Sequence, residues 1–164
     1  MSFEEIKQIV SSRFGEDTFT VSNIKSYQPI LQIPINHLIA VCSFLHSDEK
    51  LYFDYLACLT GIDNGVDKGT IDVVYNLNSI PYQSNLTIKV TISRQVSGYS
   101  VIPTVSNIWK TADWHEREAY DLMGIHFEGH PDLRRILLPN DWQGYPLRKD
   151  YQEQEFYHGI KVIY

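Results

Sequence analysis

Apolar residues recur at intervals of three and four in three parts of the chain, a spacing that places them on one face of a helix. We therefore predict helices over residues 3–14, 34–46 and 107–123. The first begins with a capping box at residues 2–5, and the third is followed by Gly124, which suits the left-handed turn that ends many helices. The apolar face of the third helix should pack on a sheet, and it consists of Ile108, Ala112, His115, Ala119 and Leu122.

Runs of β-branched and aromatic residues, bounded by Gly, Pro, Asn and Ser, predict strands over residues 18–22, 27–33, 70–77 and 85–93. The apolar stretch at 51–63 suits either a strand or a short helix, and its periodicity does not decide between them. Helices packed on one face of a mixed β-sheet make a two-layer α+β fold. We expect this domain to cover residues 1–140, followed by residues 141–164 as an extended, irregular C-terminal docking segment.

The sequence has 164 residues, which suits one domain, and its net charge is −6. Residues 1–102 hold seven Lys and Arg against ten Asp and Glu, and residues 103–164 hold the same numbers. Because neither half is basic, we predict no nucleic-acid partner. The N-terminus lacks the cations of a signal peptide, and no apolar run has the ~20 residues of a membrane span, so we expect a protein that lies in or faces the cytosol.

Charged residues concentrate in the stretch HEREAYDLMGIHFEGHPDLRRILLP, residues 115–139. A zinc-protease helix needs a second His four residues after the first, but Ala119 stands there after His115. His126 and His130 are also four apart, yet the glycines and the proline around them argue against a continuous helix. There is no GxSxG, GxGxxG or Walker motif. We therefore predict no catalytic, metal-binding or cofactor-binding residue.

Three further features of the sequence favour binding over catalysis. Arg117 has Asp113 and Asp121 four residues away on either side, where helical side chains meet, so we expect an ion-pair row. Arg117 also stands between Glu116 and Glu118, and we expect it to keep these two carboxylates ionised, with a lowered pKa. The two cysteines, Cys42 and Cys58, lie in apolar sequence and are too few for an iron–sulfur cluster. The Gly- and Pro-rich stretch after the third helix presents Arg, His and aromatic residues, which are typical of protein interfaces.

This stretch resembles the signature of the thirty-kilodalton (30 kDa) subunit of NADH:quinone oxidoreductase, or respiratory complex I. The matching pattern is ERE-x-YD-x-x-GI-x-F-x-GHPDLRRIL, read at residues 116–137, and a second block, DWQGYPLRKDY, spans residues 141–151. The resemblance implies a redox-silent α+β subunit of the peripheral arm of a proton-translocating enzyme, not catalytic by itself. It also implies that FMN, iron–sulfur clusters, NADH and quinone bind to partner subunits.

The resemblance further implies which residues contact partners, namely the iron–sulfur and quinone-cavity subunits. The implied partner-interface residues are Glu116, Arg117, Glu118, His130, Arg134, Arg135, Arg148, Lys149 and Asp150. The implied location is the cytoplasmic side of the cell inner membrane, with contact to the membrane only through the complex. Two departures are Tyr145, where His is common in the family, and a sequence that ends soon after the second block.

Two other functions are compatible with the sequence. Membrane-bound hydrogenases and ferredoxin-linked or other-donor-linked quinone reductases contain similar docking subunits, so membership of such a complex is the alternative. An independent small-molecule enzyme is a third hypothesis, and it requires turnover by the isolated protein. The sequence does not identify the electron donor or the quinone.

Overall fold

The computed structural model describes residues 1–22, 29–95 and 98–162. Its α-helices are α1 (Phe3–Phe14), α2 (Leu38–Ser47) and α3 (Ala112–Met123), with short 3-10 turns at Glu16–Thr18 and Ile35–His37. The strands are β1 (Thr20–Ser22), β2 (Ile30–Gln32), β3 (Tyr55–Asp63), β4 (Thr70–Ser79), β5 (Ser84–Ser93), β6 (Ser100–Pro103), β7 (Ile125–Glu128), β8 (Phe156–Tyr157) and β9 (Ile160–Lys161).

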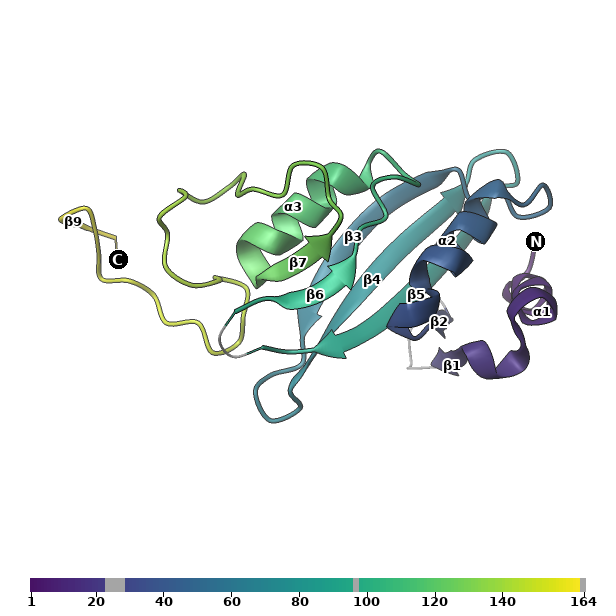
Figure 1. Cartoon of the computed structure of the whole chain (residues 1–164), viewed down its shortest axis with the longest axis horizontal. Coiled ribbons are helices and arrows are strands. Elements are labelled where there is room, and N and C mark those ends of the chain that lie inside the picture. The colour runs from purple at the N-terminus through teal and green to yellow at the C-terminus, as the bar shows by residue number, and fades with distance from the viewer. Residues whose placement is uncertain (23–28, 96–97, 163–164) are drawn as a thin grey trace.

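The main sheet has five strands in the order β1-β2-β5-β4-β3. β3, β4 and β5 form an antiparallel meander, while β2 pairs with β5 in parallel, so the sheet is mixed. β6 and β7 form a separate parallel pair, and β8 and β9 form a small hairpin at the far end of the molecule (Figure 1). The predicted α+β class with a mixed sheet is confirmed.

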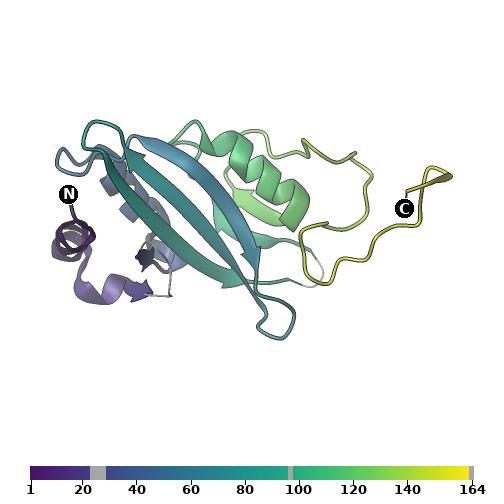
Figure 2. The same ribbon diagram turned by 180° about the vertical axis from the view of Figure 1, so that it is seen from behind.

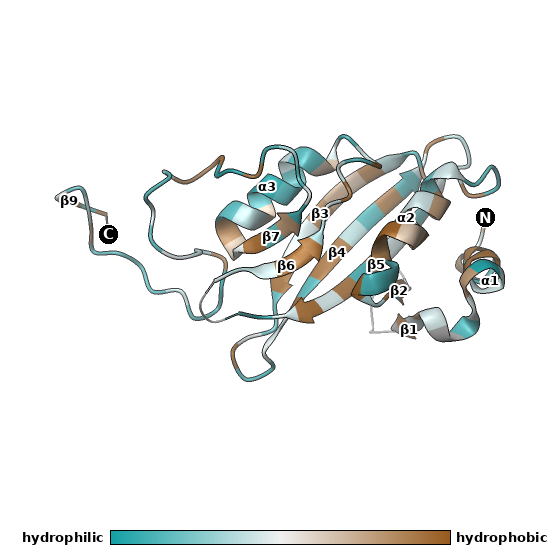
Figure 3. Ribbon diagram, in the orientation of Figure 1, coloured by the Kyte–Doolittle hydropathy of each residue, from teal (hydrophilic) through white to brown (hydrophobic). Residues whose placement is uncertain are grey.

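One face of the sheet carries the core. Along β4 every second residue is buried, and the striping of apolar and polar residues is visible in Figure 3. α2 lies over β4 and β5 on this face, and α3 packs against β3 on the same face, as Figures 1 and 2 show. The buried apolar residues of β3, β4 and β5 are Leu56, Leu59, Ile71, Val73, Tyr75, Leu77, Leu86, Ile88, Val90 and Ile92. The prediction of helices on one face is therefore confirmed.

The opposite face of β4 and β5 has no helix over it in Figure 2, and its polar side chains bond to one another. Thr91 donates to Asp72 at 2.6 Å, and the Lys89 ammonium lies 3.5 Å from the same carboxylate. Thr87 donates to Asn76 at 3.0 Å. These cross-strand pairs stabilise a face that needs no second layer.

Three sequence predictions gain detail or correction. The ambiguous stretch 51–63 is β3 from Tyr55 onward, because it finds β4 as a partner along its whole length. The third helix begins at Ala112, not at 107, because the preceding turns are held to the segment just before β3: the Trp109 indole donates to Phe53 O at 2.8 Å. The predicted strand 27–33 is β2 at Ile30–Gln32, and residues 27–28 lie outside the described residues.

The buried face of α3 also differs from the prediction. Its buried residues are Ala112, Glu116, Arg117, Ala119, Asp121 and Met123. The predicted members His115 and Leu122 are only half-buried. An apolar pattern cannot predict this face, because charged residues on it are buried with hydrogen-bonding partners from other parts of the molecule.

Gly61 in β3 allows α3 and β7 to approach the sheet. A Cβ at this position would lie 2.8 Å from Ile125 Cδ1 and 3.4 Å from Met123 Cγ. We predict that Gly61→Val lowers the free energy of unfolding by about 1–3 kcal/mol through overpacking. Thr60→Val, at the neighbouring exposed position, is the control for strand propensity. Urea titrations of both variants test this, and equal effects would contradict it.

Candidate functional site

The stretch after β7 runs along the surface beside α3 (Figure 1). We call residues 129–138 the strap. His130 Nε2 lies 3.2 Å from Asp113 O near the start of the helix, and Arg117 Nε donates to Arg134 O at 3.4 Å one turn later. The amides of the last strap residues reach the C-terminal half of the helix. The strap therefore runs parallel to α3, and its successive residues contact successive turns of the helix.

The Asp121 carboxylate holds the end of the strap. Its side chain has no exposed surface, and Oδ2 accepts hydrogen bonds from the amides of Ile136, Leu137 and Leu138 at 2.7–3.0 Å. Arg135 Nη1 donates to Oδ1 at 2.8 Å. Burial by itself would raise the pKa of Asp121, but the three amides and the arginine outweigh it, so the pKa is lowered. The group is an ionised, fully bonded carboxylate.

The Glu116 carboxylate holds the segment before α3. It is also completely buried, and it accepts a hydrogen bond from Val105 N at 2.7 Å and from Thr104 Oγ1 at 2.5 Å. Burial raises the pKa of Glu116 to about 7, although both hydrogen bonds act in the opposite direction. The sequence-based expectation of an ionised carboxylate with a lowered pKa is therefore wrong for this residue, because the expectation took no account of desolvation.

His130 lies between Asp113 and Glu116, near the start of α3. Its ring has no exposed surface, and Nδ1 accepts a hydrogen bond from Asp132 N at 3.0 Å. A neutral ring therefore carries its proton on Nε2, which points at Asp113 O and lies 3.9 Å from the Glu116 carboxylate. The imidazole thus connects the strap to the helix.

The predicted ion-pair row of Asp113, Arg117 and Asp121 does not form among the described residues. Arg117 instead lies under the ring of Trp114, 4.8 Å from its centroid, and its Nη1 is 3.9 Å from Asp132 Oδ2. Asp121 binds Arg135. The strap brings partners that bind these side chains closer than their helical neighbours do, so the local spacing is overridden.

Arg148 attaches residues 141–151, the second block of the family pattern, to the end of α3. Its Nε donates to Met123 O at 2.8 Å, Nη2 to Gly124 O at 3.3 Å, and Nη1 to Gln95 O at 2.8 Å. The Tyr145 ring covers the guanidinium at 4.6 Å. Burial lowers the pKa of Arg148, and the three carbonyls at the end of a helix and a strand compensate for the lost water.

A buried arginine joins this block to the sheet. Arg94 Nε donates to Asp63 Oδ1 at 2.8 Å, and Nη2 donates to Asp150. The amide of Lys149 donates to Asp63 Oδ2 at 2.9 Å. Burial alone would raise the pKa of Asp63, but the bonds from Arg94 and two amides lower it. The part of the predicted C-terminal segment at 148–150 thus packs on the domain before the backbone extends away from it.

The nine predicted interface residues fall into two groups. The side chains that are largely buried within the protein are those of Glu116, Arg117, His130, Arg135 and Arg148. The exposed residues are Glu118, Arg134, Lys149 and Asp150. The first group shapes the surface. The second group lies on it, where Asp150 is already bound by Arg94.

Sequence reasoning missed several residues that build this site. Thr104, Asp63 and Arg94 bind the signature residues directly, but each is a common residue type in an ordinary context, so no local signal marks them. Trp114 was also missed, although a tryptophan on the polar side of a predicted helix is unusual. It is 63% exposed.

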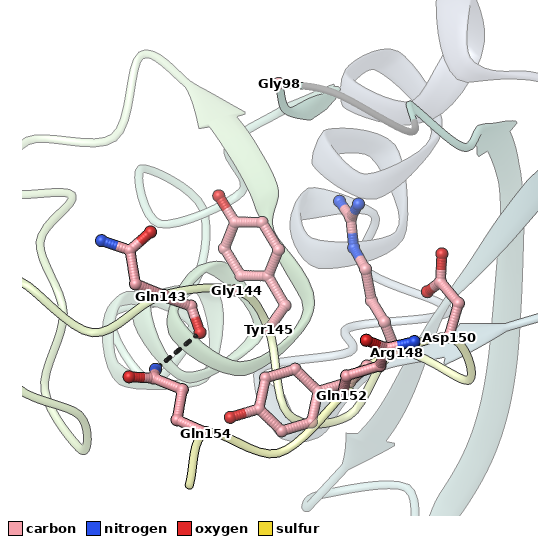
Figure 4. A pocket seen from close by; sticks show the side chains of 9 residues that line it. Gly98, Gln143, Gly144, Tyr145, Arg148, Asp150, Gln152 and Gln154 are labelled. Atoms are coloured by element: carbon pink, nitrogen blue, oxygen red, sulfur yellow. Dashed lines mark hydrogen bonds between the residues drawn. The ribbon is translucent and has the colours of Figure 1, made fainter. Parts of the chain in front are cut away.

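A pocket of about 410 Å³ opens beside the second block (Figure 4). Its lining residues are Gly98, Gln143, Gly144, Tyr145, Arg148, Asp150, Tyr151, Gln152 and Gln154. Figure 4 shows the amides of Gln143 and Gln154 on one side and Arg148 and Asp150 on the other. Since Arg148 is bound by carbonyls and Asp150 by Arg94, the two charged groups of the pocket are already engaged.

Within residues 1–22, 29–95 and 98–162, no three His, Cys, Asp or Glu side chains are placed to share a metal ion. Over the same residues, no helix combines the length and the apolar character needed to cross a bilayer. The half-buried Cys58 and the buried Cys42 are both free thiols, and burial raises the pKa of Cys42.

The raised pKa of Glu116 predicts a pH-dependent stability. The folded protein holds this proton more tightly than the unfolded one, whose carboxyl keeps a pKa near 4.5, so the stabilisation is complete below that pH and is lost as pH rises through about 7. We expect wild type to lose stability relative to Glu116→Gln over this range, by on the order of 3 kcal/mol. Urea titrations at several pH values measure the difference.

The exposed Glu118 offers the matched control for that measurement. Glu118→Gln removes the same charge from the same helix without touching a buried group. Its stability should stay parallel to wild type between pH 4.5 and 7. If Glu116→Gln also stays parallel to wild type, the buried carboxyl does not hold its proton as described.

Gly124 ends α3 in a left-handed conformation, with φ of 67°, as the sequence predicted. A Cβ there would lie 2.6 Å from the Tyr145 ring and 2.7 Å from Arg148 Nη2. Gly98 has φ of 92° with no atom within 4 Å of such a Cβ. We predict that Gly124→Ala destabilises the protein by about 1–3 kcal/mol more than Gly98→Ala in thermal unfolding. Similar losses in the two variants would show that backbone strain alone matters.

Comparison with known proteins gives a consistent result. The family model described as respiratory-chain NADH dehydrogenase, 30 Kd subunit, matches residues 31–157. The C subunit of the NADH-quinone oxidoreductase of Chloroherpeton thalassium is 52% identical over 147 residues, which are 89% of this chain and 55% of that protein. The protein of the same name from Chlorobium phaeobacteroides is 42% identical over 158 residues, covering 95% of this chain and 92% of that protein.

Among solved structures, one component of a membrane-bound sulfane sulfur reductase, an archaeal respiratory membrane complex, matches with a TM-score of 0.75. The match covers 91% of this chain and 85% of that one at 22% identity, so it concerns the fold alone. The present sequence spans about half the length of the Chloroherpeton protein and nearly all of the Chlorobium protein. On the family model and these two relatives, the chain belongs to the family of the 30-kDa subunit of respiratory-chain NADH dehydrogenase.

Proposed function

We propose that the protein is a structural subunit of a proton-translocating NADH:quinone oxidoreductase, where it holds neighbouring subunits in place and carries no redox centre itself. The observation that supports this most is that buried residues of the signature bind the backbone of their own chain, while others stay exposed. Glu116 and Asp121 bind backbone amides of their own chain and give the surface around α3 one shape. Arg134 then stands exposed on the shaped strap. A preformed charged surface suits protein binding, because little entropy is lost on docking.

Rigidity of this kind fits a complex that transfers electrons. Transfer between redox centres depends on fixed separations, so a subunit without a centre contributes by keeping the others in position. A large, partly charged interface provides the free energy of binding and fixes the relative orientation of the subunits. We propose that the neighbours are the iron–sulfur and quinone-cavity subunits, and that FMN, iron–sulfur clusters, NADH and quinone bind to partner subunits of the complex. We further propose that the complex lies with this protein on the cytoplasmic side of the inner membrane.

The test is an affinity purification of the tagged protein from gently solubilised membranes of its source organism, with co-purifying proteins identified by mass spectrometry. Recovery of NADH-binding, iron–sulfur and quinone-cavity subunits is the expected result. Recovery of a hydrogenase or of a reductase with another electron donor would replace the proposal by that alternative. A preparation that recovers no membrane-complex subunit would overturn it, and turnover of a small molecule by the purified protein would favour an independent enzyme.

Arg134→Ala provides a test at one residue. Arg134 is exposed, and its only side-chain partner within the described residues is Asp132, so its loss should leave the fold intact. Removing one member of a charge pair buried at an interface costs about 2–5 kcal/mol of binding. We predict less of the variant in the assembled complex and unchanged NADH:quinone turnover per complex, measured by native gel and by activity in the same fractions.

Arg13→Ala is the matched control, because Arg13 is an exposed arginine in the last turn of α1, on a different helix. It should leave both the amount of complex and its turnover unchanged. Normal abundance of the Arg134→Ala complex together with altered turnover would refute an assembly role for Arg134.

A further inference from the structure

Trp114 is the large aromatic residue that α3 presents outward, and its position is unlike that of the other two tryptophans. Trp109 is 2% exposed and Trp142 is half-buried, while Trp114 is 63% exposed. Exposure alone carries little meaning, since isolated apolar side chains occur on most protein surfaces. The contacts that hold the indole are more informative.

The Trp114 ring is fixed from below by an arginine that is itself held in place. The Arg117 guanidinium lies 4.8 Å from the ring centroid, and this arginine is only 6% exposed. Its Nε donates to Arg134 O, and its Nη1 lies 3.9 Å from Asp132 Oδ2. A cation held over one ring face stabilises that orientation of the indole and leaves the other face free. Because the rotamer is set in advance, binding would order little additional structure.

An exposed cation continues the same set of contacts. Asp132, which faces Arg117, also accepts two hydrogen bonds from Arg134 Nε, at 2.9 and 3.0 Å. In the described part of the protein, these side-chain bonds use only Nε of Arg134, whose side chain is 69% exposed. The two Nη groups therefore face solvent with the planar geometry that binds a carboxylate through two parallel hydrogen bonds.

We propose that Trp114, Arg117, Asp132 and Arg134 form a docking platform for an acidic segment of a partner subunit. The segment would place an aliphatic or proline side chain on the free face of Trp114 and a carboxylate on the Nη groups of Arg134. The proposal rests on the proposed function and names the chemistry of the partner. Charge complementarity supports it, because two arginines and one aspartate make the platform cationic on a protein whose net charge is −6. Tryptophan and arginine are also the residues that most often dominate interface binding energy.

Hydroxyl-radical footprinting of the indoles tests the platform directly. The isolated protein and the purified membrane complex that contains it are oxidised under the same conditions, and modification is read by mass spectrometry. We expect Trp114 to be modified readily in the isolated protein and to fall in the complex to the level of the buried Trp109, which serves as internal standard. Protection of Trp114 in the complex supports the proposal.

The outcomes separate this inference from the proposed function. A protein recovered in the complex with Trp114 as reactive as in isolation overturns the platform and leaves the proposed function standing. Failure to recover the protein in any NADH:quinone oxidoreductase overturns the proposed function, and with it the inference that rests on it. Protection of Trp114 in the isolated protein that grows with concentration would mean that a second copy covers it, which also contradicts the proposal.

Substitutions at Trp114 and Arg134 test whether the contact is aromatic and charged as proposed. Trp114→Ala should weaken recovery with the complex by roughly 30-fold or more, as for truncation of an interface tryptophan, and Trp114→Phe should retain part of it. Arg134→Glu should lower recovery further than Arg134→Ala, because it places like charges together. Ile80→Ala removes a 64% exposed apolar residue from the β4–β5 turn and should have no effect. Equal recovery of Arg134→Glu and Arg134→Ala would exclude an acidic partner.

Discussion

The buried carboxylate of Asp121 is the group on which the surface around α3 depends. A carboxylate with no access to water is stable in a protein only when hydrogen-bond donors surround it. Here three consecutive amides, from Ile136 to Leu138, and the guanidinium of Arg135 fill that need. The same bonds give an otherwise irregular segment a defined path. The strap has neither helix nor strand to satisfy these amides, so the carboxylate replaces the missing backbone partners.

Two further buried side chains extend this principle to other parts of the domain. Glu116 joins α3 to the segment that follows β6, through bonds to Thr104 and Val105. Arg148 joins the end of α3 to the C-terminal block through backbone oxygens. The sheet and its apolar core make a stable base, and these buried side chains attach irregular segments to it. A protein built this way can present a long surface without regular secondary structure and still keep its shape.

This organisation suits membership of a multi-subunit family. The residues that identify the family in this sequence divide into those that shape the surface and those that stand on it. Arg117 is the clearest link between the two groups, because it is buried, contacts the strap, and supports the exposed Trp114. A partner that binds such a surface meets groups whose positions are already set. The exposed arginine of the strap then contributes charge in a fixed place, which favours specific binding over tight but unspecific attraction.

The amino-acid sequence by itself determined the features whose signals are local. The capping box of α1, the alternation along β4 and the left-handed stop at Gly124 each depend on neighbouring residues, and the structure has all three. The residue identities of the signature were also enough to indicate the family. Only the tertiary structure decided the roles within that signature. Glu116 and Asp121 find their partners 11 to 17 residues away, in segments without periodicity, and burial changes what a carboxylate does. The helical spacing of Asp113, Arg117 and Asp121 predicted ion pairs that stabilise an exposed surface only weakly. In the folded protein Asp121 instead makes stronger, charge-assisted hydrogen bonds to buried partners.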